Sequence, residues 1–585
     1  MRTLKGRAAK QAWAQGVMMS GSQRRKIRVL GAVALIAALL VGGGVLTALS
    51  GIGRHTAAPA ARPDAGIMHD ADNAASVPTS ALVASKGRLL LPGAQEGHES
   101  KPYLALFVLD GARPDYFNVP GIPHIRALMK HGTQYTNAFA GILESETPTG
   151  HASISSGSNP SADGILSFAW ANEDNTTVNL FDPANIRNGQ MERILHNAPA
   201  PSIAGLVHAA DPSAEVVALG GHKYYADDAL GGPSANVIMY YQGTPQGKFA
   251  PTFVPGHAPP PAVLQGASLI GKSTSLPIGT EDHLVMNLAR STFAQMHERV
   301  MLMNVPEFDW PLGHVDGGSR DPTDVKLLMQ GFDRDLGKLE DMYRRAGVLD
   351  NTEFVITADH GFAPIDHHLS ATDIEKAAEA SGTSIVSDTF HTAGYMWLKD
   401  GTRSARAAEN IARLQNPYIQ SVYFKTSANG GGYRYLRASG PDLFRTGGVE
   451  AANQYLLNSF TGPAGPDIVV LFTEQSVAET GGAASWKGDH GGAAWESQHL
   501  PLIISGPGVR AGITSQFPAR LEDIAPTVLS VMGVPHTGME GIPLADAVVQ
   551  ASAEERKAQQ VKNTQLLPVV QALARESHLE VQAGR

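Results

Sequence analysis

Metal-binding side chains lie at four places where apolar, strand-like runs of this 585-residue chain meet its loops. They are Asp110 in LFVLDGARPDY, Asp309 and His314 in NVPEFDWPLGH, Asp359 and His360 in VITADHG, and His490 in KGDHGG. The chain contains no cysteine, so any metal must be held by nitrogen and oxygen atoms. Three carboxylates and three imidazoles, with a hydroxyl and substrate, supply enough ligands for two Zn²⁺-like ions. Two such ions roughly 4 Å apart can clamp the attacking and leaving oxygens of a displacement at phosphorus.

Each of these places also has an ordinary interpretation when taken alone. An aspartate after a strand is commonly a turn or helix cap, and Asp-His-Gly by itself is a turn. The agreement of four places favours the metal-site interpretation over four unrelated turns.

The stretch LESETPTGH, residues 143–151, offers a nucleophile for that chemistry. Pro148 suits the first turn of a helix, and the helix N-terminus that follows Thr147 would receive an anion. A Thr147 hydroxyl on a metal would be partly ionised and directed at that anion. Alternatively, Thr147 caps the helix and Thr149 packs, which local sequence alone favours.

Apolar runs alternate with amphipathic segments from residue 101 onward. The predicted strands are 103–110, 214–219, 299–305, 352–359, 467–473 and 501–506. The predicted helices include 122–132, 283–298 and 324–347. This alternation predicts an α/β fold whose mostly parallel sheet is sandwiched by helices, with ligands at the carboxyl ends of the strands.

The N-terminal region has a different character from the rest of the chain. Residues 1–28 carry eight basic side chains and no acidic one, and Val29 to Leu49 is an uncharged apolar run of 21 residues. That length fits a transmembrane helix, and the flanking charge keeps the N-terminus in the cytoplasm and the rest outside it. A cleaved signal peptide normally has a shorter apolar region. Because the first segment is basic, the rest is more acidic than the net charge of -9 indicates, and we expect no binding to nucleic-acid polymers.

The expected organisation has five parts. They are a basic cytoplasmic segment (1–28), a transmembrane helix (29–50), a linker rich in Ala, Pro and Ser (51–100), a catalytic domain (101–550) and a helical tail (551–585). Within the catalytic domain, residues of about 385–440 break the alternation and are expected to form a small α+β insertion.

The ordered motifs resemble the alkaline phosphatase superfamily, and most of all its branch of type I phosphodiesterases and nucleotide pyrophosphatases. The resemblance covers roughly residues 102–545, including the closing DIAPTVLSVMG segment. It implies one zinc site formed by Asp309, His314 and His490, and a second formed by Asp110, Asp359, His360 and the Thr147 oxygen. It also implies a phospho-threonine intermediate on Thr147, four residues before a histidine as in the family, which water then hydrolyses.

Two features depart from the family pattern. Relatives usually have the aspartate four residues before the histidine of Asp-x-x-Gly-His, whereas Asp309 lies five before His314. An asparagine about 21 residues after the nucleophile commonly binds the phosphoryl oxygen, but that position is Phe168, which cannot donate a hydrogen bond. Candidate replacements in substrate binding are Asn172, His222 and Lys223, although a solvated surface lysine is the simpler interpretation of Lys223.

The sequence thus predicts a membrane-anchored, extracytoplasmic phosphoric-ester hydrolase with two divalent metal ions, acting on a small phosphate ester. Two alternatives remain, a transferase of phospho-head groups in the cell envelope and a catalytically impaired metal-binding scaffold. A sulfatase is disfavoured, because that branch uses a formylglycine made from Cys or Ser in a context that TPTGH does not match. The sequence leaves the oligomeric state, and the choice between monoester and diester, open.

Overall fold

The computed structural model describes residues 101–243, 248–266, 270–271, 276–438, 447–479 and 486–582. The basic segment, the transmembrane helix and the linker predicted for residues 1–100 lie outside these residues. Within the described ranges, no helix combines the length and the apolar character needed to cross a membrane.

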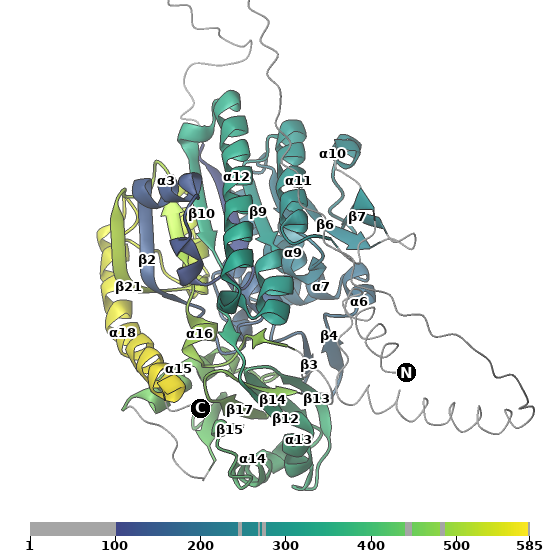
Figure 1. The fold of residues 1–585 in the computed structure, drawn as a ribbon. Coiled ribbons are helices and arrows are strands. Elements are labelled where there is room, and N and C mark those ends of the chain that lie inside the picture. The colour runs from purple at the N-terminus through teal and green to yellow at the C-terminus, as the bar shows by residue number, and fades with distance from the viewer. Residues whose placement is uncertain are drawn as a thin grey trace, which may run out of the picture. The chain divides into compact units, whose positions relative to one another are not determined.

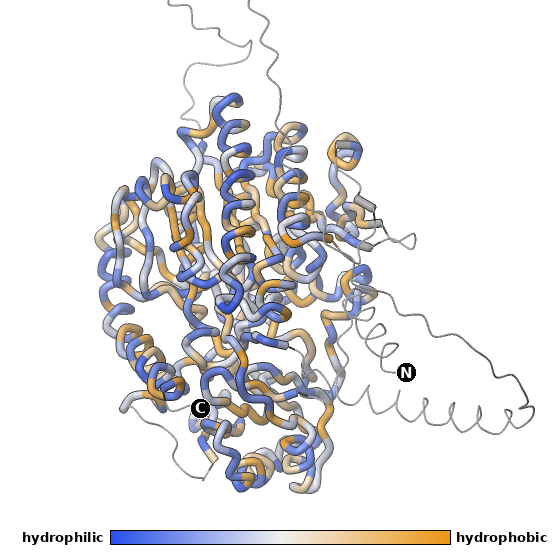
Figure 2. Tube along the Cα trace, viewed as in Figure 1, coloured by the Kyte–Doolittle hydropathy of each residue, from blue (hydrophilic) through white to orange (hydrophobic). Residues whose placement is uncertain are grey.

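A ten-stranded sheet forms the centre of the described chain (Figure 1). In spatial order its strands are β21 (Ile513–Arg520), β2 (Gly132–Phe139), β20 (Leu502–Ser505), β10 (Thr352–Thr357), β1 (Tyr103–Leu109), β9 (Val300–Val305), β5 (Val216–Leu219), β6 (Val237–Gly243), β7 (Lys248–Phe253) and β8 (Ile270–Gly271). The middle strands are almost entirely apolar and buried, and Figure 2 shows them as the most hydrophobic part of the tube.

The sheet is mixed, whereas a mostly parallel one was predicted. The five strands from β10 to β6 are parallel, but β20 runs antiparallel to both β10 and β2, and β7 is antiparallel to β6 and β8. The run that forms β20 is buried at every position and is apolar except for Ser505. Apolar character reports burial and not direction, so the sequence did not distinguish β20 from the parallel strands.

Helices cover the sheet in the places that the amphipathic runs predicted. The three predicted helices are α3 (Pro123–His131), α11 (Thr280–Met296) and α12 (Pro322–Ala346), and α11 and α12 lie side by side in front of the sheet (Figure 1). The side chain of Asp321 caps α12 by accepting hydrogen bonds from two backbone N–H groups of its first turn. The helix ends at Gly347, whose positive φ of 74° suits glycine.

A second, five-stranded sheet lies at the carboxyl-end side of the large one (Figure 1). Its order is β13 (Ile385–Phe390), β14 (Ala393–Leu398), β17 (Ile468–Phe472), β15 (Ile419–Ser427) and β16 (Tyr433–Arg437), all antiparallel, with α14 (Ser404–Ala412) packed on it. The run predicted as a strand over 467–473 is therefore the middle strand of this small sheet.

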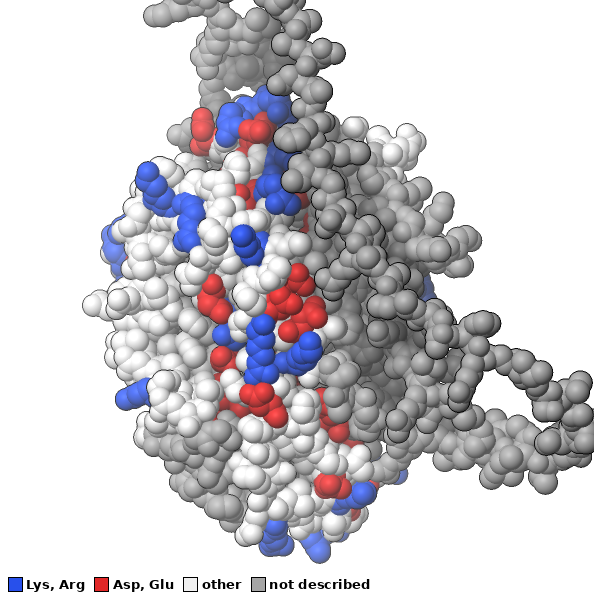
Figure 3. Space-filling model, viewed as in Figure 1, with Lys and Arg blue, Asp and Glu red and all other residues white. Residues whose placement is uncertain are grey.

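The last described helix, α18 (Ala553–Gln582), connects both sheets. It contacts β21 of the large sheet, and near its end Glu580 accepts hydrogen bonds from Gln420 Nε2 (2.9 Å) and Glu474 N (2.8 Å). On the face drawn in Figure 3, basic and acidic side chains of the described residues are intermingled.

Candidate active site at the carboxyl ends of the strands

Three neighbouring parallel strands bring the predicted ligands together. Asp110 follows β1, Asp309 follows β9 after one short turn, and Asp359 and His360 follow β10. Parallel strands end at the same edge of a sheet, so these side chains converge. All are buried, with exposures of 3% or less.

Asp309, His314 and His490 form the first cluster. Asp309 Oδ1 lies 3.3 Å from His314 Nε2 and 3.4 Å from His490 Nε2. One ligand atom from each of the three residues lies within 4.8 Å of the others, close enough to hold one metal ion. The spacing of five residues between Asp309 and His314 does not separate them, because the chain between them turns back on itself, with a non-helical kink at Trp310.

Asp110, Asp359 and His360 lie beside this cluster. His360 Nε2 is 3.4 Å from both Asp110 Oδ1 and Asp359 Oδ2, and the ring of His360 stacks on that of His490 with centroids 3.6 Å apart. Asp110 and His360 also group with Asp309, so the two clusters are continuous.

Backbone carbonyls orient the three imidazoles. The Nδ1 atoms of His314, His360 and His490 hydrogen-bond to the carbonyls of Gly488 (3.1 Å), Gly361 (2.9 Å) and Ser145 (3.2 Å). These bonds place the proton on Nδ1 and direct the Nε2 lone pairs into the site.

The residues present fit a bound cation. His360 Nε2, Asp309 Oδ1 and Asp359 Oδ2 are buried atoms with no hydrogen-bond partner among the described residues. Buried polar atoms without a partner are unfavourable unless a ligand satisfies them. A set of carboxylate oxygens and imidazole nitrogens without sulfur suits Zn²⁺ and similar ions.

Thr147 is the first residue of α4 (Thr147–Ser156), one position after the N-cap. Glu146 occupies the cap position, so the alternative in which Thr147 caps the helix is wrong. The Thr147 hydroxyl instead lies 3.3 Å from Lys223 Nζ, within the same buried site. Gly150 permits this arrangement, because an added Cβ would lie 2.5 Å from the Asp359 carbonyl oxygen.

Lys223 is buried in the site rather than solvated at the surface, so the simpler interpretation of this residue is wrong. Its Nζ lies 2.8 Å from Asp110 Oδ1 and 2.6 Å from Asp309 Oδ2. Burial lowers the pKa of Lys223, but the two carboxylates outweigh it and raise the pKa above the ordinary value. Lys223 is therefore a permanent cation beside the Thr147 hydroxyl.

His222 lies next to Lys223 but at the edge of the site, with 35% of its side chain exposed. Its Nδ1 lies 2.9 Å from Glu281 Oε1, and Glu281 also accepts from its backbone N–H. Burial lowers the pKa of His222, and Glu281 more than compensates, so the pKa is raised.

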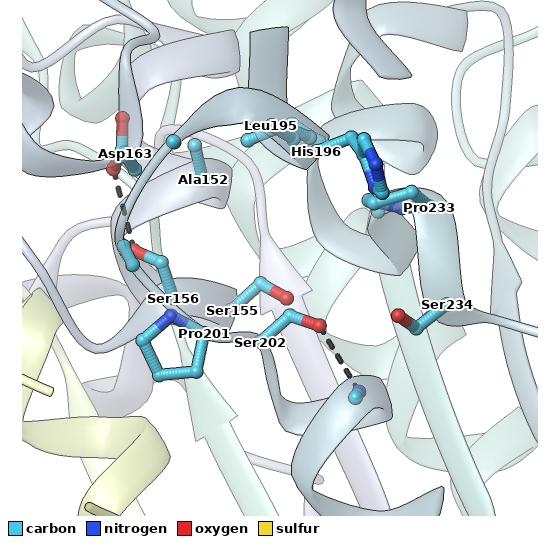
Figure 4. Close-up of a pocket in the computed structure, with 15 residues that line it drawn as sticks. Ala152, Ser155, Ser156, Asp163, Leu195, His196, Pro201, Ser202, Pro233 and Ser234 are labelled. Atoms are coloured by element: carbon cyan, nitrogen blue, oxygen red, sulfur yellow. Dashed lines mark hydrogen bonds between the residues drawn. The ribbon is translucent and has the colours of Figure 1, made fainter. Parts of the chain in front are cut away.

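Asn172 does not lie with these residues. It occupies the turn between β3 (Ala169–Ala171) and β4 (Thr177–Asn179), where its side chain donates to Thr176 Oγ1 at 3.0 Å. The turn lines a cavity of about 510 Å³ beside the small sheet. Another cavity of about 200 Å³, shown in Figure 4, lies beside the C-terminal half of α4 and is lined by serines such as Ser155 and Ser202. None of the candidate metal ligands lines either cavity.

Phe168 belongs to an aromatic cluster beside the site, formed by Phe168, Phe181, Tyr224 and Tyr225. Phe168 stacks on Phe181 with ring centroids 3.8 Å apart. The rings of Phe168 and Tyr225 form a T-shaped contact with centroids 4.9 Å apart. The position that relatives use for a phosphate-binding amide is thus part of the hydrophobic core.

A set of residues that the sequence did not predict supports the ligands. His151 lies with Nδ1 2.7 Å from the Thr147 carbonyl and Nε2 2.9 Å from Asn304 Nδ2, so both ring nitrogens are already engaged. Asn304 also donates to Asp110 Oδ2 at 2.7 Å. An asparagine inside the otherwise apolar run RVMLMNV was the available signal for this residue.

A second missed group comes from the small sheet. His391 lies between Glu146 (Nε2 to Oε1, 2.7 Å) and Asp489 (Nδ1 to Oδ1, 3.1 Å), and Asp489 accepts from the backbone N–H of His490 at 2.9 Å. These residues connect both flanks of the site, because Glu146 precedes Thr147 and Asp489 precedes His490. Nothing in the sequence near His391 indicated that it reaches the site.

The metal-free protein should lose stability as the pH rises from about 6.5 to about 9. Burial lowers the pKa of His360, but Asp359 and Asp110 outweigh it and raise the pKa to about 9. A raised histidine pKa contributes stability that is complete below about pH 6.5 and is lost as the pH rises through about 9. The expected loss is about 3 kcal/mol at most, measured as a falling Tm in chelator.

The replacement His360→Gln is the control, and it should flatten this dependence. A Tm of the chelated wild-type protein that does not change between pH 6.5 and 9 would contradict the assignment.

Comparisons with known proteins place this geometry in a family. The model of the family described as type I phosphodiesterase / nucleotide pyrophosphatase matches residues 104–491, more than half of the chain. Among curated proteins, arylsulfatase K of Danio rerio is 43% identical over 86 residues, which is 12% of this chain and 16% of that protein. The chain therefore matches less than a fifth of that relative's length.

Solved structures show the same fold at low sequence identity. The alkaline phosphatase PafA has a TM-score of 0.57 at 15% identity, and the match covers 77% of this chain and all of that one. Human ectonucleotide pyrophosphatase / phosphodiesterase 5 has a TM-score of 0.51 at 15% identity, over 75% of this chain and 97% of that one. An inactive murine form in complex with AMP has a TM-score of 0.50 at 14% identity, with the same coverages. These likenesses establish the alkaline phosphatase-like α/β fold.

Proposed function

Because the chain belongs to the type I phosphodiesterase / nucleotide pyrophosphatase family, we propose that it hydrolyses phosphoric esters with Thr147 as the nucleophile. One observation carries this proposal. The Thr147 hydroxyl lies in the buried cluster of carboxylates and imidazoles, at the N-terminus of α4 and beside the Lys223 cation.

Two sets of residues would hold two divalent cations, most simply Zn²⁺. Asp309, His314 and His490 would hold one, and Asp110, Asp359, His360 and the Thr147 oxygen the other. When bound, such ions supply Lewis-acid stabilisation of the oxygens that enter and leave phosphorus. His151, Asn304 and His391 keep the ligands oriented through their hydrogen bonds.

The reaction proceeds in two displacements. Thr147 Oγ1 forms a bond to phosphorus as the bond to the leaving-group oxygen breaks, and the hydroxyl proton passes through solvent to that oxygen, which gives a phospho-threonine and an alcohol. Water then attacks phosphorus, releases the phosphoryl product and restores the hydroxyl. The N-terminal end of α4 and the Lys223 ammonium favour the negative charge at the phosphoryl oxygens throughout.

The substrate is proposed to be a small phosphate ester such as a nucleotide. The AMP complex of the murine relative supports this class, as does His222, whose raised pKa favours the cationic form at the edge of the site. Glu281 orients that imidazole with its Nε2 side away from the hydrogen-bonded carboxylate.

We also propose that residues 29–50 anchor the protein in a membrane with the catalytic domain outside the cytoplasm. The uncharged run and the preceding basic cluster support this placement. Alkaline carbonate extraction of membranes should leave the protein in the pellet, and its release into the soluble fraction would contradict the anchor.

Metal removal tests the proposed chemistry directly. The full-length protein, purified in detergent, should turn over a chromogenic phosphate ester in Zn²⁺, lose at least about 100-fold of its rate in chelator and recover on readdition of Zn²⁺. A phosphate monoester, a phosphate diester and a sulfate ester should be compared in parallel, because their ratio identifies the branch. Turnover that chelation leaves unchanged would overturn the metal-dependent mechanism.

A further inference from the structure

The chain lacks an amide donor at position 168, yet a different polar group lies against that residue. Tyr225 is the second residue of α9 (Tyr224–Gly231) and follows Lys223 by two positions. Its ring meets Phe168 edge to face at 4.9 Å, with an interplanar angle of 88°. The helix α9 packs on α4, the helix that begins at Thr147.

The ring of Tyr225 is held from several sides. Phe181 lies 5.8 Å and Tyr224 lies 5.2 Å from it, each in a T-shaped arrangement. Only 8% of the residue is exposed. Such packing leaves one rotamer for the side chain, so its hydroxyl has a defined position.

The hydroxyl of Tyr225 has no hydrogen-bond partner among the described residues, although most of its ring is buried. The adjacent Tyr224 differs, because its hydroxyl donates to the Phe181 carbonyl at 2.6 Å. The Tyr225 hydroxyl is not completely buried, so part of the small exposure of this residue belongs to its oxygen. An open donor on a rigid, largely buried side chain indicates a partner that arrives with a ligand.

Lys223, two positions before Tyr225, places the start of α9 at the catalytic cluster, because its Nζ lies 3.3 Å from Thr147 Oγ1. Burial raises the pKa of Tyr225, Lys223 opposes this, and Asp110, Asp309 and Asp359 add to it. The phenol therefore keeps its proton and serves as a neutral donor. It lies within electrostatic reach of the groups that surround Thr147.

We propose that the Tyr225 hydroxyl donates a hydrogen bond to a non-bridging phosphoryl oxygen of the substrate at Thr147. This inference rests on the proposed function and extends it, because Tyr225 acts with Lys223 in place of an amide at position 168. A neutral donor beside one lysine suits the single negative charge of a phosphate diester. Tyr225 is thus a catalytic residue that differs from the one used by relatives with an asparagine.

The replacement Tyr225→Phe removes the oxygen and keeps the ring in the aromatic cluster. The kcat/KM for a phosphate diester should fall about 100-fold, mainly through kcat, because the donor acts on charge that develops in the transition state. The Ki of orthovanadate, which mimics a pentacoordinate phosphoryl group, should rise at least about tenfold. The Tm and the bound zinc, measured by atomic emission, should match the wild-type protein.

Tyr240→Phe is the matched control, since Tyr240 is a buried tyrosine beyond Tyr224, with ring centroids 5.9 Å apart. It should stay within about twofold of the wild-type rate. If Tyr225→Phe also stays within about threefold while Thr147→Ala is inactive, the role of Tyr225 is overturned and the proposed function stands. If Thr147→Ala retains its rate, the proposed function itself fails, and this inference fails with it.

Discussion

Replacing Thr147 by alanine should lower phosphoric-ester turnover by about 10⁴-fold or more, the scale seen when a covalent nucleophile is removed. The Thr147 hydroxyl lies at the start of α4 beside Lys223 Nζ, and among the described residues no other hydroxyl hydrogen-bonds to that ammonium. Acid quenching during turnover should trap phosphate on the peptide that contains Thr147 in the wild-type protein. The variant should yield no phosphopeptide there.

Thr149→Ala supplies a close control on the same helix. Thr149 is equally buried and its hydroxyl has no hydrogen-bond partner among the described residues, so it tests whether loss of any buried hydroxyl in α4 is harmful. We expect nearly full activity from this variant. A Thr147→Ala protein that keeps more than a tenth of the wild-type kcat would contradict covalent catalysis at this residue.

Removing the Lys223 charge should destabilise the metal-free protein by about 3–5 kcal/mol, the usual effect of breaking a buried ion pair from one side. In Lys223→Met, the carboxylates of Asp110 and Asp309 lose the ammonium that lies within 2.8 Å of both. Zn²⁺ should restore most of the loss, because cations would then balance these carboxylates. Urea unfolding in chelator and in Zn²⁺ measures both effects.

Lys425→Met separates this effect from the general cost of losing a buried lysine. Lys425 Nζ donates to the carbonyl of Pro463 at 2.9 Å and lies 3.7 Å from Asp467, within the small sheet. Its loss should destabilise the protein equally with and without Zn²⁺. If the loss of stability in Lys223→Met is also the same with and without Zn²⁺, Lys223 does not share its carboxylates with the metal site.

The sequence predicted the metal-ligand candidates that follow the strands. Their positions along the chain and the direction of the strands are enough to bring them together. Asp110, Asp309, Asp359 and His360 each lie shortly after an apolar run that forms one of three adjacent parallel strands. Their convergence follows from the geometry of any such sheet. The same reasoning failed for β20, whose direction depends on the connection that precedes it and not on its composition.

The outer part of the site could not be predicted, because it depends on contacts between distant segments. His391 reaches Glu146 across 245 positions of sequence only because the small sheet packs against the start of α4. The burial of Lys223 could not be predicted, because the flanking glycine-rich turn gives no sign of it. The surroundings of Tyr225 depend on its contact with the ring of Phe168, which lies 57 positions earlier in the sequence.

The backbone carbonyls that orient His314, His360 and His490 have a consequence for how such proteins diversify. The orientation of each imidazole is fixed by a hydrogen bond to a backbone carbonyl. Most side-chain replacements leave the backbone in place. Side chains around the substrate can therefore be replaced while the three imidazoles keep their orientation. Proteins of one fold can in this way keep the same reactive centre and differ in the substrate that they cleave.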